Sequence, residues 1–462
     1  MFRGEKTPEN RKTVIKGEKM TGSARQTAYE ALLRVERDKA YSNIILDKLL
    51  SGSELPGRDK AFASMLFYGV MEKKLLLDYN LSQLSSKPVN KLDIEILIIL
   101  RMGLYQLFFA DSVTDAAAVN ESVRLCKINR QSSASGFVNA VLRNAVKLSE
   151  LRLPEKKKGK NKYYSIKYSC PEKIIKLWRS AYGDGITEGI LSSLSEKPVL
   201  YARVNTLRIT PEQLALRLEK KGIRTEQSIV SGNCIAMYGA GAVQELEEYR
   251  EGLFHIQDAA CQLCCGMLHV KKGDTAADVC AAPGGKSFTI AEIMENEGQI
   301  ISCDLYENRL RLVSSGAERL GISIIRTHTG DSSRLENMPP ADAVLCDVPC
   351  SGLGIIRKKP ELRYKDELGT DSLPELQYDI LCSAASILKP GGRLVYSTCT
   401  LNPSENGGNI RRFLSEHEDF EPVPLELPEG IKRMIQEPEN ELTLFPQMCR
   451  TDGFFISAVR RK

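Results

Sequence analysis

Apolar residues in the first third of the chain recur at the spacing of helix faces. Between Ala24 and Lys147 they fall three or four positions apart, with few prolines among them. Three such faces are Ala28, Leu32 and Val35; Ala61, Met65, Leu66 and Val70; and Ile94, Ile98, Met102 and Leu104. A period near 3.6 residues is typical of helices with one buried face, so this part is predicted to be an all-α bundle.

The pattern changes after a basic, non-periodic stretch, Leu153 to Lys162. A helix-prone segment from Pro171 to Glu196 follows, and strand and helix patterns then alternate over residues 199–248. Strands are predicted at Leu200–Val204 and Ile235–Met237, with a helix between them that Thr210 caps and Pro211 begins. These patterns predict a small α/β unit.

From Phe254 onward, strand and helix patterns alternate to the end of the chain. Predicted strands are Thr275–Cys280, Gln299–Cys303, Ile322–Thr327, Ala343–Cys346 and Arg393–Ser397, and predicted helices are Ser287–Asn296, Glu307–Leu320 and Ser372–Leu388. Such alternation predicts a doubly wound, mostly parallel sheet. The expected fold class is therefore α/β, with an all-α domain and a small α/β domain in front of the main sheet.

The same patterns divide the chain into segments of different kinds. We expect a flexible tail at 1–22, a helical domain at 23–150, a basic linker at 151–165, a small α/β domain at 166–250 and the main α/β domain at 251–462.

Composition narrows the setting in which this protein works. A net charge of +5 permits a nucleic-acid partner without demanding one. The 13 cysteines are an odd number, and residues 1–20 are polar and charged with no apolar core. Both observations favour a reducing, cytoplasmic location with free thiols over a secreted, disulfide-bonded protein.

Two further classes of protein are disfavoured by particular stretches. The longest apolar run, Ile94 to Ala110, is interrupted by Glu95, Arg101 and Gln106, so we expect a core helix and no membrane partner. The group Cys261, Cys264 and Cys265 has no second Cys or His pair, and its spacing suits one buried face of a helix. We therefore expect no metal site.

Carboxylates and glycines follow successive predicted strands of the main domain. The stretch Asp278 to Lys286, with Gly284 and Gly285, precedes a helix whose N-terminus offers unpaired N–H groups. Asp304 ends the next strand, where a carboxylate can bind the hydroxyls of a ribose, and Asp331 follows the third. The Gly-x-Gly-x-x-Gly and P-loop patterns are absent, so S-adenosylmethionine fits better than a dinucleotide or a nucleoside triphosphate.

Two predicted strands are followed by a thiol. Cys350 lies in Asp347-Val-Pro-Cys-Ser-Gly352, and Cys399 lies in Ser397-Thr-Cys-Thr400. An ionised thiol is a good nucleophile toward an electron-poor ring, and a nearby carboxyl group can stabilise charge that develops on that ring. The residues by themselves leave open which thiol attacks.

The first domain resembles a known RNA-binding helical domain of the NusB type. The resemblance rests on Leu104-Tyr-Gln-Leu107, Val119-Asn-Glu-Ser-Val123 and Gly136-Phe-Val-Asn-Ala-Val-Leu-Arg143. It implies an RNA partner. Scattered basic residues of this domain are candidates for an RNA-facing surface, although such charges are more often a solvated helix face.

Most of the remaining chain, residues 166–462, resembles the RNA 5-methylcytosine methyltransferase family, the Sun/NOL/NSUN group. The motifs that carry this resemblance are Gln257-Asp-Ala259, Asp278–Lys286, Asp304, Asp331, Asp347–Gly352, Arg357-Lys-Lys-Pro-Glu361, Ser397–Thr400 and Thr451-Asp-Gly-Phe-Phe455. Together with the NusB-like domain, they imply a Rossmann-like enzyme that uses S-adenosylmethionine to methylate carbon 5 of a cytosine in 16S ribosomal RNA.

The resemblance also implies roles for individual residues. Cys399 would be the nucleophile that forms an adduct with carbon 6, Cys350 would assist release, and Asp347 would contact N3 of the cytosine. The cofactor would be held by Cys280, Ala281, Ala282, Pro283, Gly284, Gly285, Lys286, Asp304, Asp331 and Asp347. The thiol of Cys280 is expected to pack in the cofactor loop and not to react.

Other hypotheses remain beside this one. A catalytically silent RNA-binding or assembly factor would be favoured by loss of Cys399 or Asp347, and both are present. A family member acting on another RNA is a second alternative, whereas a nicotinamide dehydrogenase is disfavoured by the missing glycine fingerprint. We expect a monomer whose partner is small-subunit ribosomal RNA.

Overall fold

The computed structural model describes residues 23–38, 42–365, 372–434 and 440–462. The tail predicted at 1–22 lies outside these described residues. The chain forms two compact units, and the division between them falls between Arg152 and Leu153.

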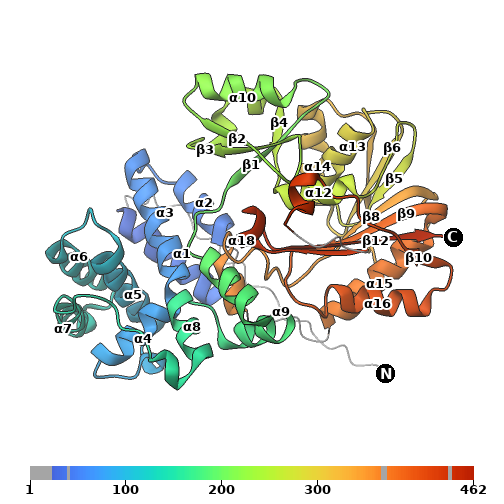
Figure 1. Cartoon of the computed structure of the whole chain (residues 1–462). Coiled ribbons are helices and arrows are strands. Elements are labelled where there is room, and N and C mark those ends of the chain that lie inside the picture. Colours follow the sequence, from blue (N-terminus) through green and yellow to red (C-terminus); the bar gives the residue numbers. More distant parts are fainter. Residues whose placement is uncertain (1–22, 39–41, 366–371, 435–439) are drawn as a thin grey trace, which may run out of the picture. The chain divides into compact units, whose positions relative to one another are not determined.

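The first unit is all-α over its described residues, as the apolar spacing predicts (Figure 1). Its helices are α1 (Ala24–Asp38), α2 (Ser42–Ser51), α3 (Gly57–Glu72), α4 (Lys74–Leu84), α5 (Ile94–Phe109), α6 (Asp115–Ile128) and α7 (Ser135–Ala145). Helix α5 is buried over most of its length and contributes Ile98, Ile99 and Leu100 to one continuous core. The apolar run expected to be a core helix is therefore confirmed as one.

The second unit begins with helices where a linker was expected. Helix α8 (Lys160–Tyr168) starts inside the basic stretch 151–165, and α9 (Glu172–Ser193) follows it. Tyr164 and Trp178 bury their rings in a shared apolar cluster. The lysines that gave this stretch its linker-like composition surround tyrosines that pack, so a helix forms despite the charge.

A small antiparallel sheet follows, with strand order β2-β3-β1-β4 in the described residues. Its elements are β1 (Leu200–Val204), α10 (Pro211–Lys220), β2 (Arg224–Gln227), β3 (Cys234–Tyr238), α11 (Glu247–Arg250) and β4 (Phe254–Ile256). Helix α10 begins as predicted, because the Thr210 side chain accepts from the backbone N–H of Gln213, whose side chain bonds back to Thr210. This confirms the small α/β unit.

The main sheet has strand order β10-β12-β9-β8-β5-β6-β7 in the described residues, with β11 paired to β12. Its strands are β5 (Thr275–Asp278), β6 (Gln299–Asp304), β7 (Ile325–Thr329), β8 (Ala341–Asp347), β9 (Leu388–Thr398), β10 (Phe420–Pro422), β11 (Glu441–Leu444) and β12 (Phe454–Arg461). Strands β5 to β9 pair in parallel, and β10 to β12 are antiparallel.

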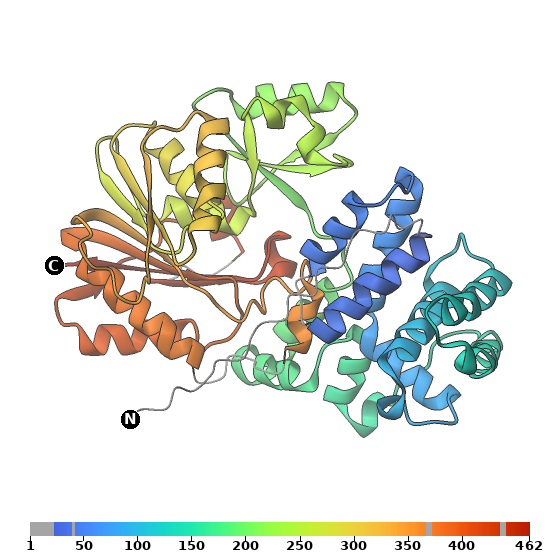
Figure 2. The ribbon, with the colours of Figure 1, turned by 180° about the vertical axis from the view of Figure 1, so that it is seen from behind.

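Helices cover both faces of this sheet, as Figures 1 and 2 show from opposite sides. On one face lie α12 (Ala259–Gly266), α13 (Gly285–Ile293) and α14 (Glu307–Leu320), and on the other lie α15 (Ser372–Ser386) and α16 (Gly407–Glu416). The short helices α17 (Glu429–Lys432) and α18 (Pro446–Cys449) precede the last strands. The predicted doubly wound, Rossmann-like sheet is confirmed.

Element boundaries differ from the predictions where long-range pairing decides them. Leu388, predicted to end a helix, begins β9 because it pairs with Ala341 of β8. The antiparallel strands near the C-terminus carry no local signal that sets their direction. Among the described residues, no helix is long and apolar enough to cross a membrane.

Candidate active site

The chemistry-bearing residues lie at the carboxyl ends of the parallel strands. Asp278 ends β5, Asp304 ends β6, Asp347 ends β8, and Cys399 directly follows β9. Asp331 lies two residues beyond β7. Because β7, β6, β5, β8 and β9 are consecutive in the sheet, these groups line one edge in the order in which they are paired.

The two thiols singled out in the sequence meet at this edge. The Sγ atoms of Cys350 and Cys399 lie 3.2 Å apart. Both residues are partly exposed, whereas Cys346 on the adjoining strand is buried in the core. Of these three, Cys350 and Cys399 are therefore the thiols that a substrate can reach.

Asp347 is held on both sides by residues from different elements. The Lys286 ammonium of α13 donates to Asp347 Oδ2 at 2.6 Å, and the Ser397 hydroxyl of β9 donates to Asp347 Oδ1 at 2.8 Å. Although burial opposes it, Asp347 raises the pKa of Lys286 well above its usual value. The pair is therefore a fixed ammonium and carboxylate beside the thiols.

The surroundings of Cys399 favour its protonated form before substrate binds. Its contact with the Cys350 thiol, its burial and the Asp347 carboxylate raise the pKa of Cys399 well above that of an ordinary thiol. The Lys286 ammonium acts in the opposite direction. Ionisation of this thiol consequently requires removal of a proton whose pKa is raised, and Lys286 is the charge that favours the thiolate.

The loop between β5 and α13 has the features of a cradle for a ligand. Gly284 has φ +110°, and a Cβ atom there would lie 2.5 Å from the Phe288 ring. The backbone of Ala281 is fixed to β6 by a bond from its N–H to the Cys303 carbonyl, 2.7 Å long. Glycine is therefore required at this turn, both for its positive φ and for the close packing of the Phe288 ring, and the first turn of α13 that follows offers backbone N–H donors to a ligand.

Asp278 lies beneath this loop with one oxygen satisfied and one without a protein partner. Ser287 donates to Asp278 Oδ2 at 2.7 Å, while the buried Oδ1 has no hydrogen-bond partner. Burial raises the pKa of this carboxyl group to about 6. An orphaned buried acceptor beside a glycine cradle fits a polar ligand that brings its own donor. Cys280 is partly buried and packs against the core below.

The remaining two cofactor candidates differ in their surroundings. Asp304 is buried, and Arg309 forms an ion pair with it at 3.1 Å while also donating to the Ala282 carbonyl. Asp331 is exposed, and its Oδ1 accepts from the Ser333 N–H at 2.9 Å. The Gly330 N–H donates to the Asp304 carbonyl, so the two carboxylates lie on adjacent strand ends.

A buried charge cluster lies in motifs to which the sequence patterns gave no role. Lys358 donates to Asp258 Oδ2 at 2.8 Å and to Asp452 Oδ2 at 2.7 Å. Asp258 also caps α12 by accepting from the Ala260 N–H. The three motifs around these residues are far apart in the sequence, so their convergence appears only in the folded chain.

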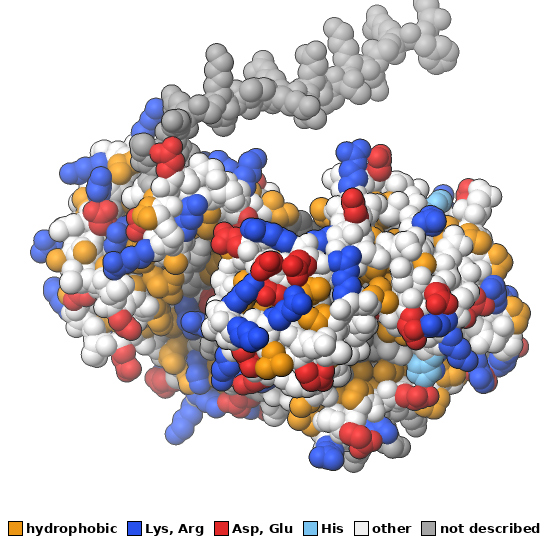
Figure 3. All heavy atoms as spheres, turned by 90° about the horizontal axis from the view of Figure 1, so that it is seen from above, with side chains coloured by type: hydrophobic (Ala, Val, Ile, Leu, Met, Phe, Trp, Pro, Cys, Tyr) orange, Lys and Arg blue, Asp and Glu red, His pale blue; other side chains and the backbone are white. Residues whose placement is uncertain are grey.

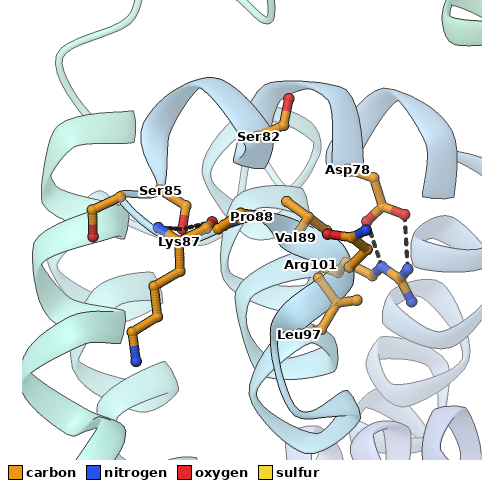
Figure 4. A pocket seen from close by; sticks show the side chains of 10 residues that line it. Asp78, Ser82, Ser85, Lys87, Pro88, Val89, Leu97 and Arg101 are labelled. Atoms are coloured by element: carbon orange, nitrogen blue, oxygen red, sulfur yellow. Dashed lines mark hydrogen bonds and ion pairs between the residues drawn. The ribbon is translucent and has the colours of Figure 1, made fainter.

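A pocket of about 750 Å³ lies in the helical unit (Figure 4). Arg101 lines it, but Asp78 takes two hydrogen bonds from its guanidinium at 2.7 and 2.8 Å, and Glu36 takes a third at 3.0 Å. The cation is thus already neutralised, and no thiol or histidine lines the pocket. It has no feature of a catalytic centre.

Three further observations concern surface charge, possible metal ligands and cysteine positions. In the view of Figure 3, Lys and Arg side chains are interspersed with Asp and Glu side chains. Among the described residues, no group of three His, Cys, Asp or Glu side chains is arranged to hold a metal ion. Cys264 and Cys265 of α12 are buried in the core, as their helical spacing predicts, and Cys261 of the same helix is partly buried.

Comparisons with known proteins agree with this arrangement along the whole chain. A family model described as 16S rRNA methyltransferase RsmB/F matches residues 265–460. The NusB family model matches residues 22–147, and the ferredoxin-like domain of RsmF/B-like methyltransferases matches residues 170–244. The resemblances seen in the sequence motifs are confirmed.

Individual relatives match over nearly their full length. The chain is 34% identical to the probable ribosomal RNA small subunit methyltransferase B of Bacillus subtilis, over 95% of this chain and 99% of that protein. A similarly described protein of Synechocystis is also 34% identical, over 95% and 99% of the two chains. The crystal structure of PH0851 has a TM-score of 0.80 at 26% identity, covering 96% of this chain and 100% of that one.

The glycine cradle, the orphaned Asp278 oxygen and the neighbouring carboxylates fit S-adenosylmethionine, and the paired thiols lie beside them. With the matches over its full length, the chain belongs to the 16S rRNA methyltransferase RsmB/F family and is an S-adenosylmethionine-dependent methyltransferase.

Proposed function

We propose that this enzyme methylates carbon 5 of a specific cytosine in 16S ribosomal RNA through a covalent bond between Cys399 and carbon 6. The observation that carries the proposal is the 3.2 Å separation of the Cys350 and Cys399 sulfurs beside the Lys286–Asp347 pair. An acid–base pair and two adjacent thiols are what this reaction needs.

The choice of ribosomal RNA is supported by the relatives and by the first unit. Curated relatives are described as ribosomal RNA small subunit methyltransferases, and the helical unit matches the NusB family. Double-stranded RNA hides the edges of its bases, so the target cytosine is expected to be unpaired and turned out of its stack into the site.

Attack begins when the Cys399 thiol gives its proton to solvent and its sulfur bonds to carbon 6. The electrons of the C5–C6 double bond then move toward N3, which takes up a proton. Asp347 faces N3 in this proposal, and the proton is drawn from the pair that Asp347 forms with Lys286 at 2.6 Å. Carbon 5 becomes electron-rich as a result, because the ring is now an enamine.

Once carbon 5 carries its methyl group, the bond between carbon 6 and the Cys399 sulfur must break to release the RNA. Cys350, after giving its own proton to solvent, removes the remaining proton from carbon 5 as a thiolate. The C5–C6 double bond re-forms, the bond from carbon 6 to the Cys399 sulfur breaks, and N3 returns its proton. The 3.2 Å contact between the two sulfurs supports this division of roles, because carbons 5 and 6 are adjacent in the ring.

The cofactor is proposed to be held by residues 280–286 together with Asp304, Asp331 and Asp347. Bound S-adenosylmethionine supplies the methyl group as an electrophile. Asp304 and Asp331 would accept from hydroxyl and amino groups of the adenosine half, since they lie on neighbouring strand ends. The Asp278 oxygen without a partner would accept from a donor on the other half.

The decisive test is Cys399→Ala, because this change removes the nucleophile and leaves the cofactor loop untouched. We expect methyl transfer from labelled S-adenosylmethionine to small-subunit ribosomal RNA to vanish while the cofactor still binds. Bisulfite mapping of RNA from cells with and without the enzyme would identify the cytosine. Near-normal turnover by the variant would refute the adduct, and no difference in the maps would favour a silent RNA-binding factor.

A further inference from the structure

A buried carboxylate, that of Glu405, is bonded to Ser351, the residue that follows Cys350. Glu405, in the loop between β9 and α16, has an exposed fraction of 0%. Within the described part of the chain its side chain forms no ion pair with Lys, Arg or His. Its partners are all neutral donors: Ser351 N–H, Ser351 Oγ, Gln377 Nε2 and Asn402 Nδ2.

Burying an unpaired carboxylate is costly unless hydrogen bonds satisfy it completely. Glu405 Oε1 accepts from Ser351 Oγ at 2.6 Å and from Asn402 at 2.8 Å. Its Oε2 accepts from Ser351 N–H and from Gln377, each at 2.9 Å. An apolar side chain would fill this space at lower cost, so the arrangement indicates a task for the charge.

The bonds to Glu405 hold the backbone on both sides of Cys350. Ser351 follows Cys350 and is held through its N–H and its hydroxyl. Gln377 donates both to Glu405 Oε2 and to the Pro349 carbonyl, 2.9 Å in each case. The turn that carries the Cys350 thiol is therefore fixed before and after the cysteine.

The same carboxylate reaches the Cys399 loop through one more hydroxyl. Ser351 Oγ lies 2.7 Å from Thr400 Oγ1, and since its single hydrogen is given to Glu405, the Thr400 hydroxyl donates to it. Cys399 has further supports of its own. Its carbonyl accepts from Gly354 N–H at 2.9 Å, and it directly follows strand β9.

We propose that Glu405 is a positioning residue that keeps the Cys350 sulfur on Cys399 and so supports the release step. This inference rests on the proposed roles of the two thiols. Because Cys350 depends on Glu405 more than Cys399 does, loss of the carboxylate should impair release before it impairs attack.

Glu405→Gln tests the charge at constant shape. The amide NH₂ group of glutamine is a donor, and it must take the place of Oε1 or of Oε2, each of which accepts from two donors in the wild type. A backbone N–H such as that of Ser351 can only donate, so donor would face donor. We expect turnover on small-subunit ribosomal RNA to fall at least tenfold. An enzyme–RNA adduct should accumulate on denaturing gels, as for Cys350→Ala, while cofactor affinity stays close to wild type in the folded variant.

Matched variants separate this outcome from a general structural effect. Glu418→Gln makes the same change at an exposed carboxylate and should behave as wild type. Glu405→Asp, which keeps the charge, should restore part of the release rate. Adding Glu405→Gln to Cys350→Ala should not raise the adduct yield further, because both changes act on one step.

Folded Glu405→Gln with wild-type turnover and adduct yield would overturn the inference, as would loss of the adduct altogether. If that variant does not fold, Ser351→Ala decides, since it removes the hydroxyl that joins Glu405 to Thr400. Its adduct yield should exceed that of wild type, and wild-type release would refute the inference. A wild-type enzyme that forms no 5-methylcytosine would instead refute the proposed function.

Discussion

At the scale of single residues, the site combines a thiol that is hard to ionise with a fixed ammonium. The pKa of Cys399 is raised well above its usual value by Cys350, by burial and by Asp347, and Lys286 is the opposing charge. These surroundings favour the protonated form of the Cys399 thiol.

The raised pKa of Cys399 predicts how the rate depends on pH. Below that pKa the thiolate fraction grows as pH rises, so single-turnover methyl transfer should increase by up to about tenfold per pH unit between about pH 6 and 9. The measurement is the initial rate with saturating RNA and cofactor, with cofactor affinity determined at each pH. A rate that stays constant across this range would contradict the protonated ground state.

Cys350→Ala should separate attack from release. The Cys399 sulfur keeps its other neighbours in this variant, so the bond to carbon 6 still forms, but the proton on carbon 5 has no base beside it. We expect multiple-turnover activity to fall at least about a hundredfold with the adduct visible on denaturing gels. Digestion of the RNA should remove the shifted band. Absence of an adduct in a folded, cofactor-binding variant would argue against a release role.

The sequence motifs located most residues of the site but not their interactions. Thiols and carboxylates after predicted strands are found together because parallel strands end at one edge. That Lys286 reaches Asp347, and that Glu405 supports Cys350, depends on side-chain directions across 61 and 54 residues. No spacing rule along the chain records such contacts. Asp331 shows the same limit from the other side. Its place after a strand is clear in the sequence, but the structure gives its carboxylate an exposed position.

At the scale of elements, a buried ion pair joins the small sheet to the main domain. Arg203 of β1 donates to Glu292 of α13 at 2.7 Å, with side chains 5% and 0% exposed. His255 of β4 faces the same carboxylate at 3.6 Å, and burial lowers its pKa to about 3, so it is neutral. Burial raises the pKa of Glu292 to about 7, and Arg203 opposes this. The pair therefore ties β1 of the small sheet to α13, the helix that follows the loop after β5.

Arg203→Met should destabilise the second unit by about 3 kcal/mol near pH 8, because it leaves a buried carboxylate without its cation. Because the folded-state pKa of Glu292 is raised to about 7, this carboxyl group is protonated and neutral near pH 5 and ionised near pH 8. Only the ionised form needs the cation of Arg203. The destabilisation should therefore shrink near pH 5. Chemical unfolding at both pH values measures this.

A double variant provides the control for this prediction. Replacing both Arg203 and Glu292 by Met removes the charge together with its partner, and most of the stability should return. A loss in Arg203→Met that is equal at both pH values would show that packing of the arginine, and not the charge of Glu292, is what matters.

At the scale of the whole molecule, two compact units divide the work proposed for this chain. The thiols, the cofactor loop and their supports all lie in the second unit, after Leu153. The first unit has its own continuous core and matches the NusB family. Binding of RNA by one unit and chemistry by the other is the simplest division that these facts support.

Removing the first unit tests this division. A fragment from Leu153 to Lys462 should bind S-adenosylmethionine within about threefold of the full chain, while its affinity for small-subunit ribosomal RNA should fall at least about tenfold. Calorimetry and filter binding at one fixed salt concentration measure the two affinities. An equal loss of both would mean that the first unit supports the fold of the second and has no separate part in RNA binding.

The sequence by itself determined the class of each region and the edge at which chemistry occurs. Helical and alternating periods are local, because each follows from which side chains one element buries, so they predicted the bundle, the small unit and the wound sheet. Tertiary structure alone decided the direction of β10 to β12, the start of β9 at Leu388 and the meeting of Cys350 with Cys399 at 3.2 Å. These depend on pairing and packing between segments far apart in the chain, where local preference has no influence.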